Sequence, residues 1–247
     1  MDNNTSTQLD PRRLEVLYEQ AVPSLAASLL TTLVVAFALW DHVQTSRLII
    51  WFSVFSILSG IRYYLVHRYF RSNTKLTRFD FWLHLYVASA LVSGIMWGLS
   101  AYIIMLDDNV LYTGFLLMCI VGLIAGSISS YSVFHSVFYA FSLPAIILFS
   151  IFLYDTGGTA FNTMIYLSCF FFLFMSIIEN RTHKIINHSI ALQFNNTSLL
   201  GYVDDIERQS KAFEGRATKE NVKNAHLEDE LKAAKLKIQK LEQELKK

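Results

Sequence analysis

Few side chains in the apolar part of this sequence are able to do chemistry, and Arg62 stands out among them. It is the one basic residue within an apolar run of membrane-spanning length. Because it stands about four residues from the end of that run, its guanidinium can extend to the lipid headgroups. The alternative is a buried arginine that contacts an anionic ligand or a headgroup, since charges inside a membrane commonly mark functional sites. Both interpretations stay open, and His84 is a second candidate for a ligand or headgroup contact.

Histidines near a membrane can also hold haem or a metal ion. His84 and His135 are the two candidates, but neither lies deep in an apolar run, and no carboxylate or cysteine stands at ligand spacing in the sequence. Cys119 and Cys169 lie in apolar runs and are interpreted as inert core thiols. Phosphate-binding loops, Ser/His/Asp sets and zinc signatures are absent from the sequence. The sequence therefore predicts no metal, no cofactor and no enzymatic activity.

Two pairs of glycines predict close contacts between helices. Gly94 and Gly98 are four residues apart in one apolar run, and Gly122 and Gly126 have the same spacing in another. Small residues at this spacing share one face of a helix and let a neighbouring backbone approach closely in lipid. We expect both pairs to serve packing within one bundle. The alternative is a packing face that shifts during signalling.

The apolar runs that carry these residues are predicted to be membrane-spanning helices. Hydrophobic residues make up 53% of the chain and charged residues 17%, whereas charged residues are about 25% of ordinary soluble domains. Trp40, Trp51 and Trp82 lie near the ends of runs, which predicts an aromatic belt. Six spans are predicted, at approximately 21–40, 48–66, 81–106, 110–129, 137–154 and 163–179.

The charges around these spans predict the orientation of the chain. Most flanking Lys and Arg residues belong to the N-terminal flank, the second connection and the segment after the sixth span, while only Arg47 lies in the connections of the other side. The positive-inside rule then places both termini in the cytoplasm. The residues on the cytoplasmic side are Arg12, Arg13, Arg68, Arg71, Lys75, Arg78, Arg181 and Lys184.

Three regions follow from this organisation. Residues 1–20 are expected to form a cytoplasmic interfacial helix with Asp10 as its N-cap and Pro11 at its first helical position. Residues 21–180 form the transmembrane domain, and residues 181–247 form a cytoplasmic coiled-coil signalling helix. The predicted fold is therefore all-α, with a polytopic bundle of about six transmembrane helices followed by a long coiled-coil helix.

The C-terminal region has an apolar repeat of seven, which is typical of a coiled coil. Opposite charges meet across a parallel pair at Lys223 with Glu228 and at Glu230 with Lys235, so a parallel homodimer is predicted. The alternative is a single solvated helix. Because its basic residues alternate with acidic ones, the helix is not expected to bind nucleic acid. The strongest part of the seam consists of Asn224, Leu227, Leu231, Ala234, Ile238, Leu241 and Leu245.

Several stretches together carry a family resemblance. They are "RRLEVLYEQAVPSLAASLLTTLVVAFALW" (12–40), "SGIMWGLS" (93–100), "VGLIAGSISSYSVFHSVFYAFSLPAIILF" (121–149) and "NRTHKIINHSIALQFNNTSLL" (180–200). The chain resembles the multi-helix membrane input region found at the N-terminus of bacterial diguanylate cyclases, cyclic-di-GMP phosphodiesterases and sensor or hybrid histidine kinases. It contains no GGDEF-type or EAL-type block and no histidine-kinase phosphoacceptor block.

This resemblance implies signal input and transmission without an enzyme, in a bacterial inner membrane. The expected function is a dimeric sensory module that senses an unknown small or lipophilic ligand, or the lipid itself, and passes a signal along the coiled coil to an output domain outside this chain. One alternative is a passive membrane anchor that only dimerises its output domain. The other is a small channel or transporter, which is less favoured because the spans have few polar groups near their middle.

Overall fold

The computed structural model describes residues 3–72, 78–104 and 109–244, and within these residues it is all-helical and contains no strand. The predicted all-α fold is therefore confirmed. Side chains of residues 3–9 and of part of the chain beyond residue 193 lie outside the description. The helices are α1 (Asn3–Glu19), α2 (Ala21–Ala38), α3 (Thr45–Arg71), α4 (Phe79–Gly98), α5 (Ser100–Ile104), α6 (Val110–Tyr131), α7 (His135–Thr156) and α8 (Thr159–Glu244).

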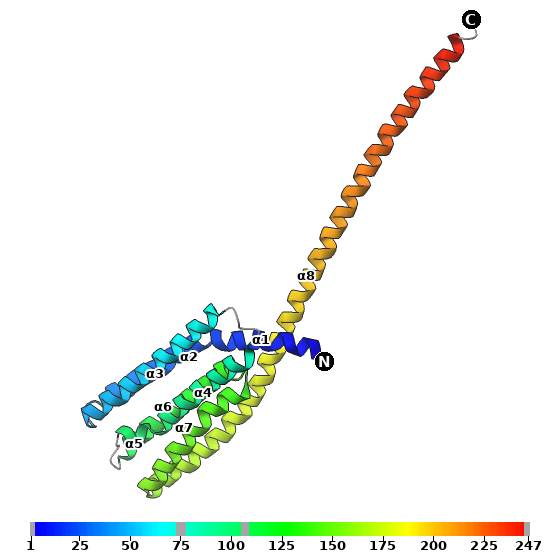
Figure 1. Ribbon diagram of the computed structural model, residues 1–247. Helices are drawn as coiled ribbons and strands as arrows, with labels where there is room; N and C mark the ends of the chain where they lie inside the picture. The colour runs from blue at the N-terminus through cyan, green and yellow to red at the C-terminus, as the bar shows by residue number, and fades with distance from the viewer. Residues whose placement is uncertain (1–2, 73–77, 105–108, 245–247) are drawn as a thin grey trace. The chain divides into compact units, whose positions relative to one another are not determined.

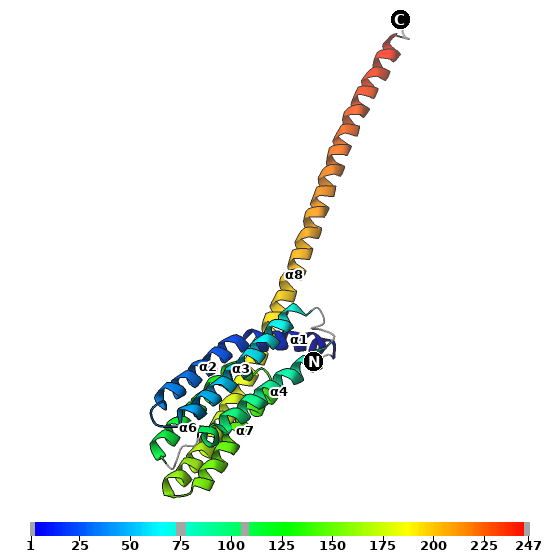
Figure 2. The ribbon, with the colours of Figure 1, turned by 60° about the vertical axis from the view of Figure 1, so that its left-hand side comes forward.

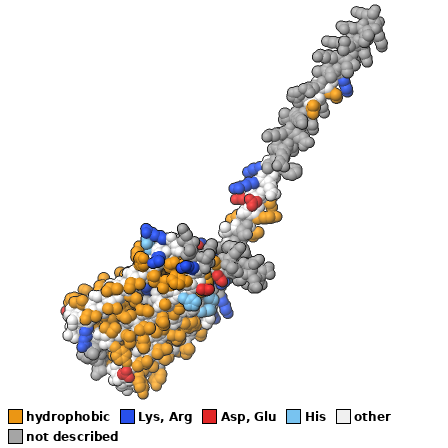
Figure 3. Space-filling model, viewed as in Figure 1, with side chains coloured by type: hydrophobic (Ala, Val, Ile, Leu, Met, Phe, Trp, Pro, Cys, Tyr) orange, Lys and Arg blue, Asp and Glu red, His pale blue; other side chains and the backbone are white. Residues whose placement is uncertain are grey.

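Six stretches among the described residues are helical, long and apolar enough to cross a membrane, as predicted. They are Asp10–Ala38, the four helices α3, α4, α6 and α7, and the part of α8 within Thr159–Gln193. Figure 3 shows hydrophobic side chains over most of the visible face of this bundle, while charged and histidine side chains gather toward one end of it. An apolar outer surface with its backbone hydrogen bonds satisfied inside helices suits lipid. The chain is a multi-pass membrane protein.

The spans pack in pairs that run side by side (Figure 1 and Figure 2). The most extensive contact joins α4 to α7, while α2 pairs with α3, and α6 lies against α7 and α2. Trp51 and Phe55 of α3 contact Trp97 of α4 with ring centroids 5.7 and 4.9 Å apart. Trp51 and Trp82 are buried and Trp40 is exposed, so the predicted belt is wrong for two of its three members. Large rings in these positions stabilise the bundle core instead.

The third predicted span, 81–106, is shorter than expected. Helix α4 ends at Gly98, and after Leu99 the short helix α5 covers Ser100–Ile104, while residues 105 and 106 lie outside the described part of the chain. Ser100 Oγ donates a hydrogen bond to the Trp97 carbonyl oxygen at 2.5 Å. Such a side-chain bond competes with the backbone ladder and favours a break in the helix.

The N-terminal helix begins earlier than predicted. It starts at Asn3, so Asp10 is not its N-cap and Pro11 lies inside the helix. Proline has no backbone N–H to donate to the helical ladder, but the helix continues on both sides of it. The break between α1 and α2 falls at Gln20, which is the end of the predicted 1–20 region.

The chain divides into two compact units, Met1–Ala191 and Leu192–Lys247. The first unit extends beyond the predicted boundary at residue 180 because α8 still contacts the turn between α6 and α7. His183 Nδ1 lies 2.7 Å from the Ser132 carbonyl oxygen, and Ile190 is buried.

In the second unit the described backbone, from Leu192 to Glu244, is one uninterrupted part of α8. Of the predicted seam residues, Leu227 and Leu231 are exposed on the single chain. Coiled-coil pairing stays a prediction. The side chains of Asn224, Ala234, Ile238, Leu241 and Leu245 lie outside the described residues.

Candidate functional site

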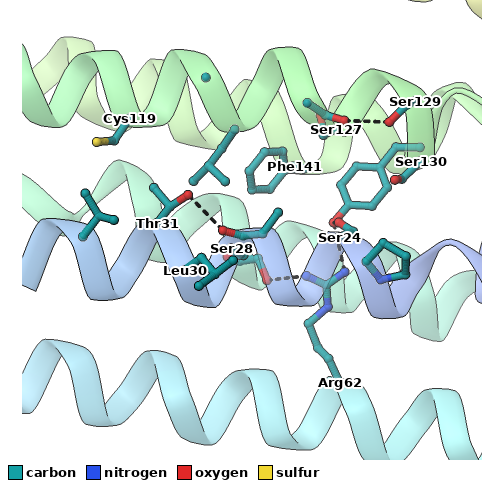
Figure 4. A pocket seen from close by; sticks show the side chains of 18 residues that line it. Ser24, Ser28, Leu30, Thr31, Arg62, Cys119, Ser127, Ser129, Ser130 and Phe141 are labelled. Atoms are coloured by element: carbon teal, nitrogen blue, oxygen red, sulfur yellow. Dashed lines mark hydrogen bonds between the residues drawn. The ribbon is translucent and has the colours of Figure 1, made fainter.

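Arg62 lies inside the bundle rather than at its lipid-facing surface. It is only 6% exposed, and its Nη1 donates to Ser93 Oγ of α4 at 3.1 Å. Its Nη2 donates to the hydroxyl oxygen of Tyr131, the last residue of α6, also at 3.1 Å. Figure 4 shows the side chain rising from α3 into the space between the helices. The interpretation that Arg62 extends to the membrane edge is therefore wrong, because its guanidinium is held by two partners in the bundle.

The groups around the guanidinium are neutral. Its Cζ lies 5.8 Å from the ring centroid of Tyr86, which is within cation–π range. Ser24 of α2 donates to the same Tyr131 hydroxyl at 3.2 Å, so four helices meet in this network. No carboxylate among the described residues lies within ion-pair distance of Arg62. The positive charge is therefore compensated by dipoles and an aromatic face alone.

This network forms one end of a cavity of about 550 Å³. Its walls come mainly from α2 and α6, with Arg62 from α3, Ser93 from α4 and Phe141 from α7. Cavities of about 300–1,000 Å³ are the usual size of small-molecule sites. The volume is thus sufficient for a ligand of moderate size.

The cavity has a charged end and an apolar end. Figure 4 shows Arg62, Ser24 and Ser130 toward one end, and Leu30, Thr31 and Cys119 toward the other. An arginine can donate up to five hydrogen bonds. A carboxylate or phosphate is therefore a suitable acceptor for the Arg62 N–H groups that do not bond to Ser93 or Tyr131. The geometry fits an amphiphile with an anionic head and a hydrocarbon body.

The two glycine pairs have different surroundings. A side chain at Gly94 would meet the Phe141 backbone and Pro144 Cγ of α7, and a Cβ at Gly98 would lie 2.6 Å from the Pro144 carbonyl oxygen. At Gly122 and Gly126, by contrast, a Cβ would have no such neighbour within 4 Å. Both of these glycines line the cavity. The expected close packing is therefore wrong for the pair on α6 within this chain.

His84 lies apart from Arg62. Its ring is exposed, with Nδ1 2.6 Å from the Asp80 carbonyl oxygen of the same helix, and it does not line the cavity. A headgroup contact at His84 remains a prediction. Of the two cysteines, Cys119 borders the cavity and Cys169 is exposed, so Cys169 is not a core thiol.

Ser93 and Tyr131 are the site residues that reasoning from sequence missed. Ser93 stands 31 residues from Arg62, and Tyr131 stands at the end of a span, 69 residues from Arg62. No spacing rule links residues so far apart. Asn109 offers an indirect signal, because its side-chain oxygen accepts the Leu111 N–H at 3.0 Å, starting α6 and so setting where Tyr131 falls.

Comparisons with protein-family models, with curated proteins and with solved structures found no match to this chain. The resemblance to bacterial signalling input regions therefore stays a prediction from sequence. What the chain can do has to be argued from its own geometry.

Proposed function

We propose that this protein is a dimeric membrane sensory module in which an anionic amphiphile occupies the Arg62 cavity, and that α8 transmits its binding to an output domain. The observation that carries the proposal is the buried guanidinium at the end of a cavity of about 550 Å³. The ligand class is a small or lipophilic molecule with one carboxylate or phosphate group.

The charge of Arg62 supports an anionic ligand. Burial of a charge is unfavourable unless an opposite charge or several hydrogen bonds compensate it. Ser93 and Tyr131 supply two neutral acceptors at 3.1 Å each, which leaves a formal positive charge without an acidic partner among the described side chains. A bound carboxylate or phosphate would offset that charge with charge-assisted hydrogen bonds, which are stronger than neutral ones.

The continuity of α8 supports transmission. One helix carries the sixth span and the residues beyond Leu192 without interruption. In the second unit the apolar seam residues Leu199, Val203 and Ile206 are all exposed on the single chain. A stripe of apolar side chains at heptad spacing favours a partner helix, because pairing removes it from water.

A fusion to a dimer-dependent cyclase or kinase tests the proposal. Residues should be deleted one at a time between Gly215 and Leu227, where Asn224 weakens the seam. Each deletion rotates everything downstream by about 100°, and seven deletions nearly restore the original facing. A transmitting module should give an output that alternates with deletion length. A flat output at equal protein levels would favour a passive anchor and contradict transmission.

Arg62→Gln in the same fusion tests the cavity. It should change the output, because glutamine keeps hydrogen bonding but removes the charge. Arg68→Gln is the matched control, since Arg68 lies on the same helix and is exposed. An output that shifts equally in both variants would show a general effect of charge loss and contradict a ligand role for Arg62.

A further inference from the structure

A second polar cluster lies away from the Arg62 cavity, where α8 meets the start of α7. Glu179 of α8 is 0% exposed, and its two carboxylate oxygens lie 2.9 and 3.0 Å from His135 Nδ1. No carboxylate stands close to His135 in the sequence. The partner stands 44 residues away and is brought in by the packing of α8 on α7.

His183 completes the cluster. It lies four residues after Glu179, so one face of α8 carries both side chains. Its ring stacks on that of His135 with centroids 3.6 Å apart and an interplanar angle of 26°. One ligand atom from each of His135, Glu179 and His183 can be chosen so that all three lie within 4.8 Å of one another.

The surroundings prepare His183 as a ligand. Its Nδ1 lies 2.7 Å from the Ser132 carbonyl oxygen, and an N–H donated there leaves Nε2 with its lone pair. Histidines that bind metal commonly donate the other ring N–H to a carbonyl or carboxylate in this way. His135 turns its Nδ1 toward the two Glu179 carboxylate oxygens, so an ion held between these residues would take the place of the hydrogen bond between them.

A neighbouring amide has an unused oxygen. The Asn187 side-chain nitrogen lies 3.0 Å from His183 Nε2, and the buried Asn187 Oδ1 has no hydrogen-bond partner among the described residues. Rotation of the amide would exchange the two atoms and turn the oxygen toward the cluster. As the amide stands, its nitrogen faces His183 Nε2 and the Val133 carbonyl oxygen, so this rotation would have to accompany the binding of an ion.

We propose that His135, Glu179 and His183 bind a divalent metal ion of the zinc class. Two imidazoles and one carboxylate suit such a borderline cation, whereas purely oxygen sites suit Mg²⁺ or Ca²⁺. Nitrogen and oxygen ligands bind Zn²⁺ at about 2.0–2.2 Å, so the three donors need to approach one another by about one ångström through side-chain rotation. The exposed fraction of the His135 side chain, 43%, provides a path of entry.

The charges around the cluster favour a cation. Glu179 is buried in an apolar span, where a lone carboxylate is strongly unfavourable. Arg13 of α1 opposes positive charge at His183, and its own charge is offset in part by Asp10, whose Oδ1 lies 3.3 Å from Arg13 Nη1. A divalent ion would compensate Glu179 and keep both imidazoles neutral.

The consequence is a link between α7 and α8, with the turn after α6 positioning His183. His135 begins α7, and Ser132 belongs to the turn after α6, while the other two ligands lie on α8. Many apolar side chains of this part of α8 are exposed, including Leu167, Phe170 and Leu173. A metal ion would therefore strengthen one of the polar attachments of α8 within the first unit.

Zinc uptake by the full chain tests the proposal. The protein should be purified in detergent with an affinity tag that contains no histidine, stripped with EDTA, equilibrated with Zn²⁺ and freed of unbound metal. We expect about one zinc per chain by elemental analysis. We also expect the midpoint of thermal unfolding to rise by about 5 °C or more at a zinc concentration of 100 times Kd.

Variants locate the zinc. His183→Ala and Glu179→Gln should lose the bound zinc and the thermal shift, while His188→Ala should keep both, because His188 is exposed on the same helix and outside the cluster. Co²⁺ should give visible absorption bands with wild-type protein and lose them with His183→Ala. No zinc uptake by stripped wild-type protein overturns the proposal even if the variants fail to fold. Equal uptake by His183→Ala, or loss of uptake in His188→Ala, overturns it as well.

Discussion

The two glycine pairs have the same spacing on α4 and α6, but one forms a helix contact and the other borders a cavity. On α4, Gly94 and Gly98 let α7 approach until a Cβ at Gly98 would stand 2.6 Å from a backbone oxygen. On α6, Gly122 and Gly126 have no such neighbour within 4 Å and border a cavity. One pair brings two backbones together, and the other leaves space between helices.

The difference lies in the facing helix. Helix α7 presents Pro144 and the Phe141 backbone to the glycines of α4. These α7 atoms fill the space that side chains at the glycine positions would occupy. Helix α2 presents Ser24, Ser28 and Thr31 to the cavity that the α6 glycines line. In lipid the small residue only permits approach, and packing with the opposite surface decides whether approach occurs. A motif of small residues therefore predicts either a contact or a cavity.

The largest expected effect comes from a large side chain on the glycine face of α4, where Gly94 and Gly98 contact α7. Gly98→Leu should lower the free energy of unfolding by about 3 kcal/mol, because a large side chain forces α4 away from α7. Gly126→Leu should change it by less than about 1 kcal/mol, because its side chain enters open space. Thermal unfolding and size-exclusion profiles in detergent measure both. Equal destabilisation by the two variants would remove the distinction between the faces.

The second effect concerns Arg62, at the charged end of the cavity that the α6 glycines line. Arg62→Gln should weaken binding of dodecyl phosphate, used as a probe, by about 30-fold, since a hydrogen bond to a charged group contributes about 2 kcal/mol. Titration of the purified protein by calorimetry measures the affinity, with the exposed Arg68→Gln as control. If dodecyl phosphate binds neither wild-type protein nor the variants, the cavity does not take an anionic amphiphile of this kind.

A smaller effect is expected from reducing the cavity itself. Gly122→Leu should displace about two methylene groups of dodecyl phosphate, which corresponds to about 1.6 kcal/mol and a roughly 15-fold loss of affinity. The midpoint of thermal unfolding should stay close to that of wild-type protein. Unchanged affinity would place the probe elsewhere. Strong destabilisation would instead show that α6 packs against a partner through this face.

The smallest effect is expected at the contact between α5 and α7, which follows the α4 glycines along the chain. Tyr102 of α5 donates to Asp155 Oδ2 of α7 at 2.5 Å, and both residues are exposed. Tyr102→Phe should therefore lower the free energy of unfolding by less than about 1 kcal/mol. A double-mutant cycle with Asp155→Asn isolates the pair from other changes. A coupling energy near zero would show that the tight packing of α4 on α7 does not depend on this hydrogen bond.

Much of the fold could be predicted from sequence because it depends on local composition. Apolar runs of sufficient length predict helices in a membrane, since backbone groups there have to bond within their own segment. The six spans, the helix break at Gln20 and the apolar seam beyond residue 192 all have this local origin. Boundaries were less predictable, as the end of α4 at Gly98 shows. There a single hydroxyl, that of Ser100, affects the helix end.

Among candidate site residues, the sequence identified Arg62 but not its environment. A basic residue in an apolar run is visible from composition, yet the same pattern is compatible with a guanidinium at the membrane edge or inside the bundle. The choice depended on whether acceptors from other helices were within reach. Ser93 and Tyr131 provide them, from positions 31 and 69 residues away.

The sequence by itself determined an all-helical chain with about six membrane spans and a charged C-terminal helix, because hydrophobicity and periodicity act over neighbouring residues. Only the tertiary structure decided that one glycine pair closes a contact and the other opens a cavity. It alone also brought Glu179 and His183 to His135. The physical reason is the same in each case. Two helix faces pack together only when the shapes of both fit. The residues that this packing joins are far apart in the chain, so no local sequence pattern predicts their contact.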